Sequence, residues 1–303
     1  MRVPALPGLE LRLPSPVEVV QDERLSRRGV RLLVKRDDLI SADVPGNKWR
    51  KLKYNLADAH AAGQRTLLTF GGAYSHHIRA VAAAGQRLGL STVGVIRGEE
   101  HRPLNPVLDF AVSRGMRLTY LDRTSYRAKD SAEILEGLRR RFGEFFLIPE
   151  GGSNAAAVRG AAELPREITD AYDLICCPVG TGGTLAGLAA GLPEGKRALG
   201  FAVLKGGEFL SGEVRRLQRE HGRLTANWSL ELGYHCGGYA RRTPALDGFI
   251  EDFRRRHGWE PEWVYVAKML YGVFDLIGQG RFASGTTIVA VVTGPATPSA
   301  RTS

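Results

Sequence analysis

From residue 66 onward, short apolar runs alternate with longer stretches of helical periodicity. Strands are expected at 66–70, 92–96, 117–121, 145–148, 174–179 and 199–204, and helices at 77–88, 105–113, 131–142, 154–169 and 184–192. Two further strands are expected at 30–34 and 286–293. Strands alternating with helices in this way are typical of βαβ units. The pattern therefore predicts an α/β fold with open, mostly parallel sheets that carry helices on both faces.

The two ends of the chain follow a looser pattern. Residues 1–30 are rich in proline, glycine and charge, and we expect an extended arm there. After Lys205 the sequence predicts helices at 209–221, 244–257 and 266–277, and an extended segment at 224–232. Beyond Gly294 we expect a disordered tail.

A helix is expected to begin at the segment Gly46-Asn47-Lys48-Trp49-Arg50-Lys51-Leu52. Trp49, Leu52 and Leu56 form one apolar stripe, whereas Lys48 and Lys51 share one face. A second cation and the positive end of the helix dipole both disfavour an ammonium ion, so we expect the pKa of Lys48 to be lowered. A lowered pKa suits a lysine that forms a Schiff base. Taken alone, these residues fit a solvated basic helix better.

In open parallel sheets, ligands bind beyond the carboxyl ends of the strands. Four polar segments are expected there, at residues 71–77, 150–154, 180–184 and 293–294. The third, Gly180-Thr181-Gly182-Gly183-Thr184, combines glycines and hydroxyl groups before a helix and predicts a phosphate site. It lacks the third glycine of a dinucleotide fingerprint, because Leu185 stands there, and it lacks the lysine of a P-loop. A tight strand-to-helix turn is the structural alternative.

Ser75, His76 and His77 begin the helix that follows the first strand of the alternating pattern. A serine at a helix start can bind a substrate carboxylate, although it can also be an ordinary helix cap. Adjacent histidines rarely point to one centre, so we expect no metal. The Gly-x-Ser-x-Gly motif of serine hydrolases is absent from the sequence.

Composition narrows the function classes. The chain has 303 residues, 43% of them hydrophobic, and a formal net charge of +10. Its basic residues are scattered, which favours a solvated surface over a nucleic-acid interface. The three cysteines do not predict a disulfide framework, and no signal peptide or run of 18 apolar residues is visible. We therefore expect a cytoplasmic protein that interacts with neither membranes nor nucleic acids.

Residues 35–294 resemble the 1-aminocyclopropane-1-carboxylate deaminase and D-cysteine desulfhydrase group of pyridoxal-phosphate enzymes, which have the tryptophan-synthase-β fold (fold type II). The most specific match is Gly46-Asn47-Lys48-x-Arg50-Lys51-Leu52. The resemblance implies two open, twisted, mostly parallel sheets and pyridoxal 5'-phosphate as cofactor. It implies that Lys48 holds the cofactor covalently, that Lys51 assists its phosphate, and that the phosphate loop is Thr181, Gly182, Gly183 and Thr184. It also implies that Ser75 contacts the substrate carboxylate and that Tyr239 and Tyr265 line the substrate side.

Two positions depart from the family pattern. His76 stands where the family has an asparagine beside the phenolic oxygen of the cofactor. Val266 follows the late tyrosine, where the family has threonine or glutamate, so no carboxylate there can protonate the pyridine nitrogen. If Thr293 is the neighbour of that nitrogen, it only forms a hydrogen bond, which suits β-elimination better than opening a cyclopropane ring.

The resemblance implies a lyase or deaminase that converts a small amino acid into a 2-keto acid and ammonia, by β-elimination or by ring opening. Three alternatives stay open: β-replacement or racemisation on the same cofactor, a non-catalytic pyridoxal- or phosphate-binding protein, and a nucleic-acid binder that uses the positive charge. We expect a small mobile domain at 45–148 and a large domain made of 1–44 and 149–303. A homodimer is implied by the resemblance only.

Overall fold

The computed structural model describes residues 9–44 and 46–294, and within these residues the strands form two sheets. In the six-stranded sheet the order is β1 (Val17–Val19), β2 (Arg31–Lys35), β10 (Thr287–Val291), β7 (Leu174–Val179), β8 (Arg197–Ala202) and β9 (Trp228–Glu231). All neighbours in it are parallel except β1 and β2. In the four-stranded, fully parallel sheet the order is β5 (Met116–Leu121), β4 (Ser91–Arg97), β3 (Thr66–Gly71) and β6 (Phe146–Ile148).

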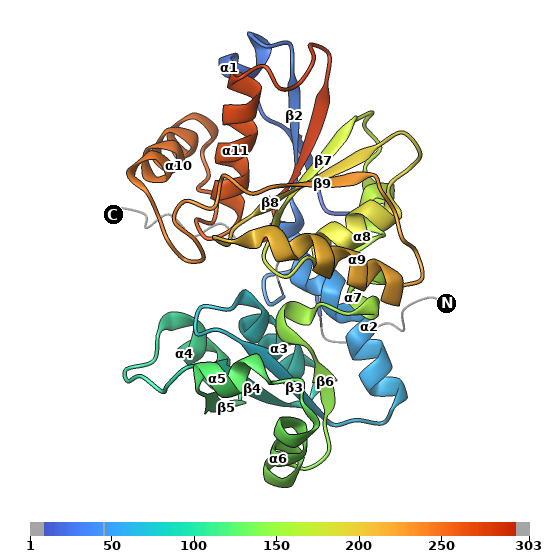
Figure 1. Ribbon diagram of the computed structural model, residues 1–303, viewed down its shortest axis with the longest axis vertical. Helices are drawn as coiled ribbons and strands as arrows, with labels where there is room; N and C mark the ends of the chain where they lie inside the picture. The colour runs from blue at the N-terminus through green and yellow to red at the C-terminus, as the bar shows by residue number, and fades with distance from the viewer. Residues whose placement is uncertain (1–8, 45, 295–303) are drawn as a thin grey trace.

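The two sheets lie at opposite ends of the long axis of the molecule (Figure 1), with the six-stranded sheet at the top. The six-stranded sheet contains strands from both ends of the chain, whereas the four-stranded sheet comes from the chain between them. The predicted α/β fold with two open, mostly parallel sheets is confirmed.

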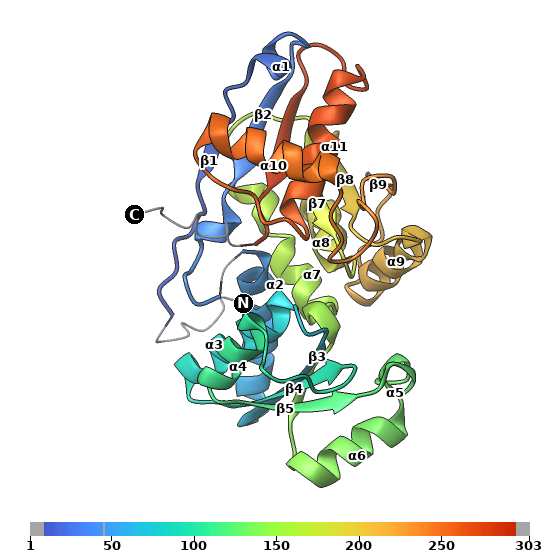
Figure 2. The same ribbon diagram turned by 90° about the vertical axis from the view of Figure 1, so that its left-hand side faces the viewer.

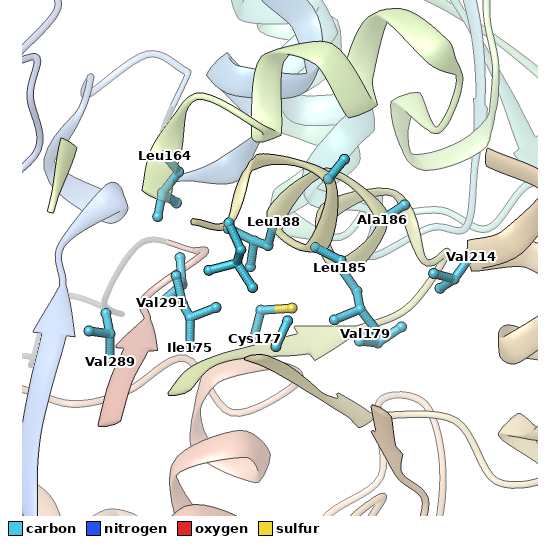
Figure 3. Packing of buried hydrophobic residues seen from close by; sticks show 14 of the residues in the cluster. Leu164, Ile175, Cys177, Val179, Leu185, Ala186, Leu188, Val214, Val289 and Val291 are labelled. Atoms are coloured by element: carbon cyan, nitrogen blue, oxygen red, sulfur yellow. The ribbon is translucent and has the colours of Figure 1, made fainter. Parts of the chain in front are cut away.

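Helices cover both faces of the six-stranded sheet. One face packs on α1 (Glu23–Ser26), α10 (Pro244–His257) and α11 (Val266–Gly278), and the other on α7 (Ala155–Ala161), α8 (Gly183–Gly191) and α9 (Leu210–Glu220). Successive strand residues point to opposite faces, so Cys177 packs towards α8 (Figure 3) and Cys176 towards α11. The apolar runs in these strands are continuous because both faces are buried.

The four-stranded sheet is covered in the same way. On one face lie α2 (Asn47–Ala61), α3 (His76–Leu88) and α4 (Pro106–Ser113), and the other face packs on α6 (Ala132–Phe142), with α5 (Arg123–Arg127) beside it. Short 3₁₀ helices complete the fold: η1 (Asp37–Leu39), η2 (Glu150–Gly152), η3 (Leu164–Glu167) and η4 (Gly207–Phe209). Across the described residues, none of the helices combines the length and the hydropathy needed to cross a membrane.

Some predicted elements were wrong in detail. The single helix expected at 154–169 is two elements, because α7 ends at Ala161 and η3 follows. Pro165 explains the break, since its ring would clash with the carbonyl of Ala161 in a continuous helix. The arm expected at 1–30 contains β1 and α1, and β8 begins at Arg197 rather than at residue 199. The tail expected to be disordered lies outside the described residues.

Buried ion pairs hold the first turn of α2 in place. The guanidinium of Arg50, 2% exposed, donates to Asp37 at 2.6 and 2.8 Å and to Glu167 at 2.7 and 2.8 Å. Lys35 on β2 also pairs with Glu167, at 2.9 Å. Helix α2 also lies against α7 (Figure 2), and Gly160 allows the contact because a Cβ there would lie 1.8 Å from the carbonyl oxygen of Arg50. Because α2 contacts elements of both sheets, it is the support from which Lys48 projects.

Candidate active site

A cavity of about 840 Å³ lies where the carboxyl ends of the strands of both sheets meet. It is lined by every site residue predicted from the sequence, namely Lys48, Lys51, Ser75, His76, Thr181, Gly182, Gly183, Thr184, Tyr239, Tyr265 and Thr293. These residues come from α2, α3, α8 and five loops, so only the folded chain brings them together.

Lys48 projects into this cavity from the first turn of α2. Its Nζ donates to Asn47 Oδ1 at 2.6 Å. Burial lowers the pKa of Lys48 to about 8, against an opposing effect of the charge of Glu262. The predicted lowering of the pKa of Lys48 is therefore confirmed. The expected cause of that lowering, a neighbouring cation, is wrong. Instead, burial and then the charge of Lys48 lower the pKa of Lys51 well below its usual range.

Lys51 faces a cup of hydroxyl groups. Its Nζ donates to Ser153 Oγ at 2.8 Å, and Ser153 Oγ lies 2.6 Å from Thr181 Oγ1. Thr184 Oγ1 accepts from Asn47 Nδ2 at 2.8 Å. The nine-residue helix α8 begins behind this cup with a glycine N-cap, so no side chain occupies its first N–H groups. We call Lys51, Ser153, Thr181, Gly183 and Thr184 the phosphate cup.

The donors of the phosphate cup fit the phosphate of a cofactor. A lysine amine, three hydroxyl groups and a helix N-terminus converge there, which is the donor set that binds a phosphate dianion. At Gly183 a Cβ would lie 2.8 Å from Ser153 Oγ and 3.1 Å from Lys51 Nζ, so any larger residue would fill the cup. Within the described residues, neither Lys51 nor Lys48 has a carboxylate within ion-pair distance. Both lysines are therefore available to a ligand.

The cavity is also lined by Ser75, His76 and two tyrosines. Ser75 is the N-cap of α3, and its Oγ accepts from Ile78 N at 3.4 Å, which leaves its own O–H free to donate. Burial, then the charges of Lys48 and Arg79, lower the pKa of His76 to about 4, so its imidazole is neutral near pH 7. The ring of Tyr265 lies between those of His76 and Tyr239, 6.0 Å from each by centroid. Burial raises the pKa of both tyrosines, so they keep their protons.

The adjacent histidines have different partners. His77 Nε2 lies 2.9 Å from Thr69 Oγ1, which itself donates to the carbonyl of Ile148, whereas His76 faces Tyr265. Nowhere in the described residues do three or more His, Cys, Asp or Glu side chains gather in a metal-binding arrangement.

Thr293 lines the cavity, and its backbone contacts the start of α2. Its carbonyl oxygen accepts from Asn47 N at 3.2 Å. Gly46 has φ +69°, and a Cβ on it would lie 1.9 Å from that same oxygen. The loop before α2 and the loop after β10 therefore cross at a point where only glycine fits.

Glu262 is a buried carboxylate near the site that the sequence reading missed. Its two oxygens accept from Val264 N at 2.7 Å and Tyr265 N at 2.9 Å, so it caps the start of α11. Burial raises its pKa, while the charge of Lys48 acts against that rise. An acid just before a helical pattern is the signal that could have revealed it. Val266, in contrast, is fully buried and apolar.

Comparisons with known proteins agree with this geometry. The family model described as pyridoxal-phosphate dependent enzyme matches residues 11–294. A protein of Pyrococcus horikoshii with the provisional name 1-aminocyclopropane-1-carboxylate deaminase is 32% identical, over 95% of this chain and 91% of its own. D-cysteine desulfhydrase of Klebsiella pneumoniae is also 32% identical, over 96% of this chain and 94% of its own.

Solved structures of similar fold agree with these sequence comparisons. The crystal structure of an ACC deaminase homologue superimposes with a TM-score of 0.83 and 29% identity, covering 94% of this chain and 90% of the other. A threonine deaminase of Solanum lycopersicum, at 19% identity and a TM-score of 0.67 over 94% of this chain and 80% of its own, shares the fold. The cofactor is pyridoxal phosphate, and the phosphate cup and Lys48 fit it. The chain therefore belongs to the family of pyridoxal-phosphate dependent enzymes.

Proposed function

We propose that this enzyme is a lyase or deaminase that converts a small amino acid into a 2-keto acid and ammonia. β-Elimination of the D-cysteine desulfhydrase type is the favoured reaction, and ring opening of 1-aminocyclopropane-1-carboxylate is the alternative. The observation that carries the proposal is that Lys48, whose pKa is lowered to about 8, and the phosphate cup line one cavity. When bound, pyridoxal phosphate supplies the electron acceptor that stabilises negative charge at the α-carbon of the substrate.

The phosphate cup would bind the phosphate of the cofactor, and Lys48 would attach the cofactor covalently. Lys51, Ser153 and Thr181 would donate hydrogen bonds to the phosphate, together with the free N–H groups at the start of α8. Lys48 Nζ provides the amine for covalent attachment. With a pKa of about 8, a useful fraction of this amine is neutral near pH 7.5, whereas an ordinary lysine would be almost fully charged.

The same Nζ of Lys48 then accepts the proton from the substrate α-carbon. Ser75 O–H and the first N–H groups of α3 orient the substrate carboxylate. Holding base and carbon acid together in one cavity supplies several kcal/mol, out of the ~7–11 kcal/mol available from good positioning. Tyr239 and Tyr265, which keep their protons, donate hydrogen bonds on the substrate side and exclude water.

Elimination is favoured over ring opening by the surroundings of Thr293. No carboxylate follows Tyr265, because Val266 is buried and apolar, and the carboxylate of Glu262 is engaged by backbone N–H groups. Thr293 offers a hydroxyl group only. A hydroxyl stabilises a charged pyridine nitrogen less than a carboxylate does, which suits a short-lived carbanion with a β-substituent ready to leave.

Borohydride reduction followed by peptide mapping tests the cofactor attachment. Purified holoenzyme is expected to be yellow, and reduction is expected to fix the label on Lys48. The variant Lys48→Ala should bind the cofactor weakly and release no keto acid, whereas Lys196→Ala, on the surface beside Asp173, should behave like the wild type. A label on another lysine, or turnover by Lys48→Ala near the wild-type rate, would contradict the proposal.

A substrate panel tests the reaction. D-cysteine, L-cysteine and 1-aminocyclopropane-1-carboxylate are supplied in turn, and sulfide, keto acid and ammonia are quantified. Equal amounts of keto acid and ammonia from a cysteine support elimination. Inversion of the amino acid without keto acid would indicate racemisation, and a new β-substituted amino acid would indicate β-replacement.

We also propose, from the family resemblance, that the enzyme acts as a homodimer in the cytoplasm. Size-exclusion chromatography with light scattering should give about twice the chain mass of 33.0 kDa. A monomer with full activity would contradict the dimer.

A further inference from the structure

Arg97 is a charged residue of the cavity that the proposed mechanism does not use. It is the last residue of β4, beside the end of β3, and it is exposed towards the cavity. Its Nη2 would lie 3.7 Å from a Cβ on Gly72. The guanidinium therefore covers the loop that leads from β3 to Ser75, the residue proposed to contact the substrate carboxylate.

The other cations of the cavity are already engaged. Among residues 9–44 and 46–294, five lysines and arginines line it. Lys48 and Lys51 serve the cofactor in the proposed mechanism. Lys129 pairs with Glu150 at 3.3 Å and Asp130 at 3.7 Å, and Arg216 pairs with Glu213 at 2.9 Å and Glu220 at 2.5 Å. Arg97 is the cation in this set that has neither a proposed role nor an ion-pair partner within the described residues.

The surroundings of Arg97 place it on the substrate side of the cavity. The ring of Tyr126 stands behind it, with the Arg97 Cζ 5.9 Å from the ring centroid. Tyr239 lies across the cavity: burial raises the pKa of Tyr239, and the positive charge of Arg97 acts against that rise. The phosphate cup is formed by other elements, namely α2, α8 and the loops before α7 and α8. An anion that meets Arg97 is therefore part of the substrate and not the cofactor phosphate.

We infer that Arg97 binds a negatively charged group on the side chain of the amino-acid substrate. The inference rests on the proposed function, because it assigns Ser75 and the α3 N-terminus to the α-carboxylate. A guanidinium presents two parallel N–H donors, which match a second carboxylate or a similar oxyanion. The proposed reaction stays β-elimination, but its preferred substrate is then a small amino acid with an anionic group on the β- or γ-carbon, for which neutral analogues of the same size, cysteine included, are poorer ligands.

Aspartate and asparagine distinguish a charged side chain from a neutral one of the same shape. Each is titrated, as both enantiomers, into the holoenzyme while the visible absorption band is followed. We expect wild type to bind one enantiomer of aspartate more tightly than the matching asparagine. In Arg97→Gln the apparent Kd for aspartate should rise about tenfold, as expected for one partly exposed charged contact, while that for asparagine changes less than about twofold.

Arg65→Gln is the matched control, because Arg65 is also an exposed arginine but precedes β3 at the opposite end of that strand. It removes the same charge and should leave both constants unchanged. An equal loss for aspartate and asparagine in Arg97→Gln would instead assign Arg97 to the α-carboxylate and overturn the inference. No preference for aspartate in the wild type would overturn it as well.

A ligand without an amino group separates this inference from the proposed function. Succinate and its mono-amide, which cannot react, are titrated into the holoenzyme by calorimetry. Preferred succinate binding that Arg97→Gln abolishes supports the anion site even if no amino acid is turned over. Keto acid formation from a neutral amino acid, with succinate binding equal in wild type and Arg97→Gln, would leave the proposed function standing and refute the role of Arg97.

Discussion

Replacing Gly183 by alanine tests the phosphate cup with a single methyl group. A Cβ at this position would lie 2.8 Å from Ser153 Oγ and 3.1 Å from both Nζ and Cε of Lys51. These distances are below ordinary van der Waals contact, which is about 3.5–4.0 Å. The atoms concerned are the ends of side chains, so they can move while the backbone stays in place. The methyl group thus displaces two of the donors that would hold the phosphate.

The expected loss follows from those two donors. A hydrogen bond to a charged group contributes about 1.5–3 kcal/mol, and partial loss of two such bonds amounts to about 3 kcal/mol. That free energy corresponds to a roughly 150-fold rise in the Kd for pyridoxal phosphate. The free energy of unfolding of the cofactor-free protein should change little, because Gly183 is the first residue of α8 and the methyl group would meet only the ends of side chains.

Titration of the cofactor-free protein with pyridoxal phosphate, followed by visible absorption, measures this Kd, and thermal unfolding measures stability. Gly212→Ala is the matched control, because Gly212 lies within α9 and a Cβ there would meet no atom within 4 Å. It should bind the cofactor as the wild type does. If Gly183→Ala bound the cofactor within about threefold of wild type, the assignment of the phosphate cup would be refuted.

Three further predictions concern α2. The rate at which pyridoxal phosphate attaches to Lys48 should rise with pH through about 8, because attachment needs the neutral amine and the amine is protonated below this pKa; a midpoint near the usual lysine value would contradict the assigned burial. Arg50→Met should lower the free energy of unfolding in urea by about 3–5 kcal/mol, since it leaves Asp37 and Glu167 buried without their partner, whereas exposed Arg140→Met should cost under about 0.5 kcal/mol. Gly160→Ala should lower the free energy of unfolding by about 1–3 kcal/mol, because it forces α2 and α7 apart. Gly137→Ala, whose Cβ meets nothing within 4 Å, should raise the free energy of unfolding by roughly 0.5 kcal/mol. Equal effects of the two substitutions would argue against the close contact between α2 and α7.

Parallel strands were predictable because they are buried on both faces. In β7 the residues Cys176 and Cys177 point to opposite helix layers, so the whole strand reads as one apolar run. β1, with three residues, and α1, with four, are too short to show any period. The break after α7 was visible in the sequence as Pro165, but the apolar pattern on either side of it suggested one helix.

The site was predictable where one continuous segment carries it. Lys48 and Lys51 lie in a single motif, and residues 181–184 form one continuous segment at the start of α8, so the glycine and hydroxyl pattern together with the family resemblance indicated them. Arg97 and Glu262 lie in separate parts of the chain. Which other segments lie beside them depends on the order of the strands in the sheets, and no local sequence pattern shows that order. The cause of the lowered pKa of Lys48 also escaped prediction, because its burial depends on the elements that enclose the cavity and not on residues adjacent in sequence.

The crossing of Gly46 with Thr293 has a consequence for how the protein is made. During synthesis on the ribosome, residue 48 emerges long before β10, which lies between β2 and β7 in the six-stranded sheet. Closing that sheet requires contacts between residues far apart in sequence, which form late. The nascent chain therefore carries the attachment lysine before it has the wall that contains Thr293. Cofactor capture is then deferred until β10 has been synthesised, so a bound cofactor marks a polypeptide in which the six-stranded sheet has closed.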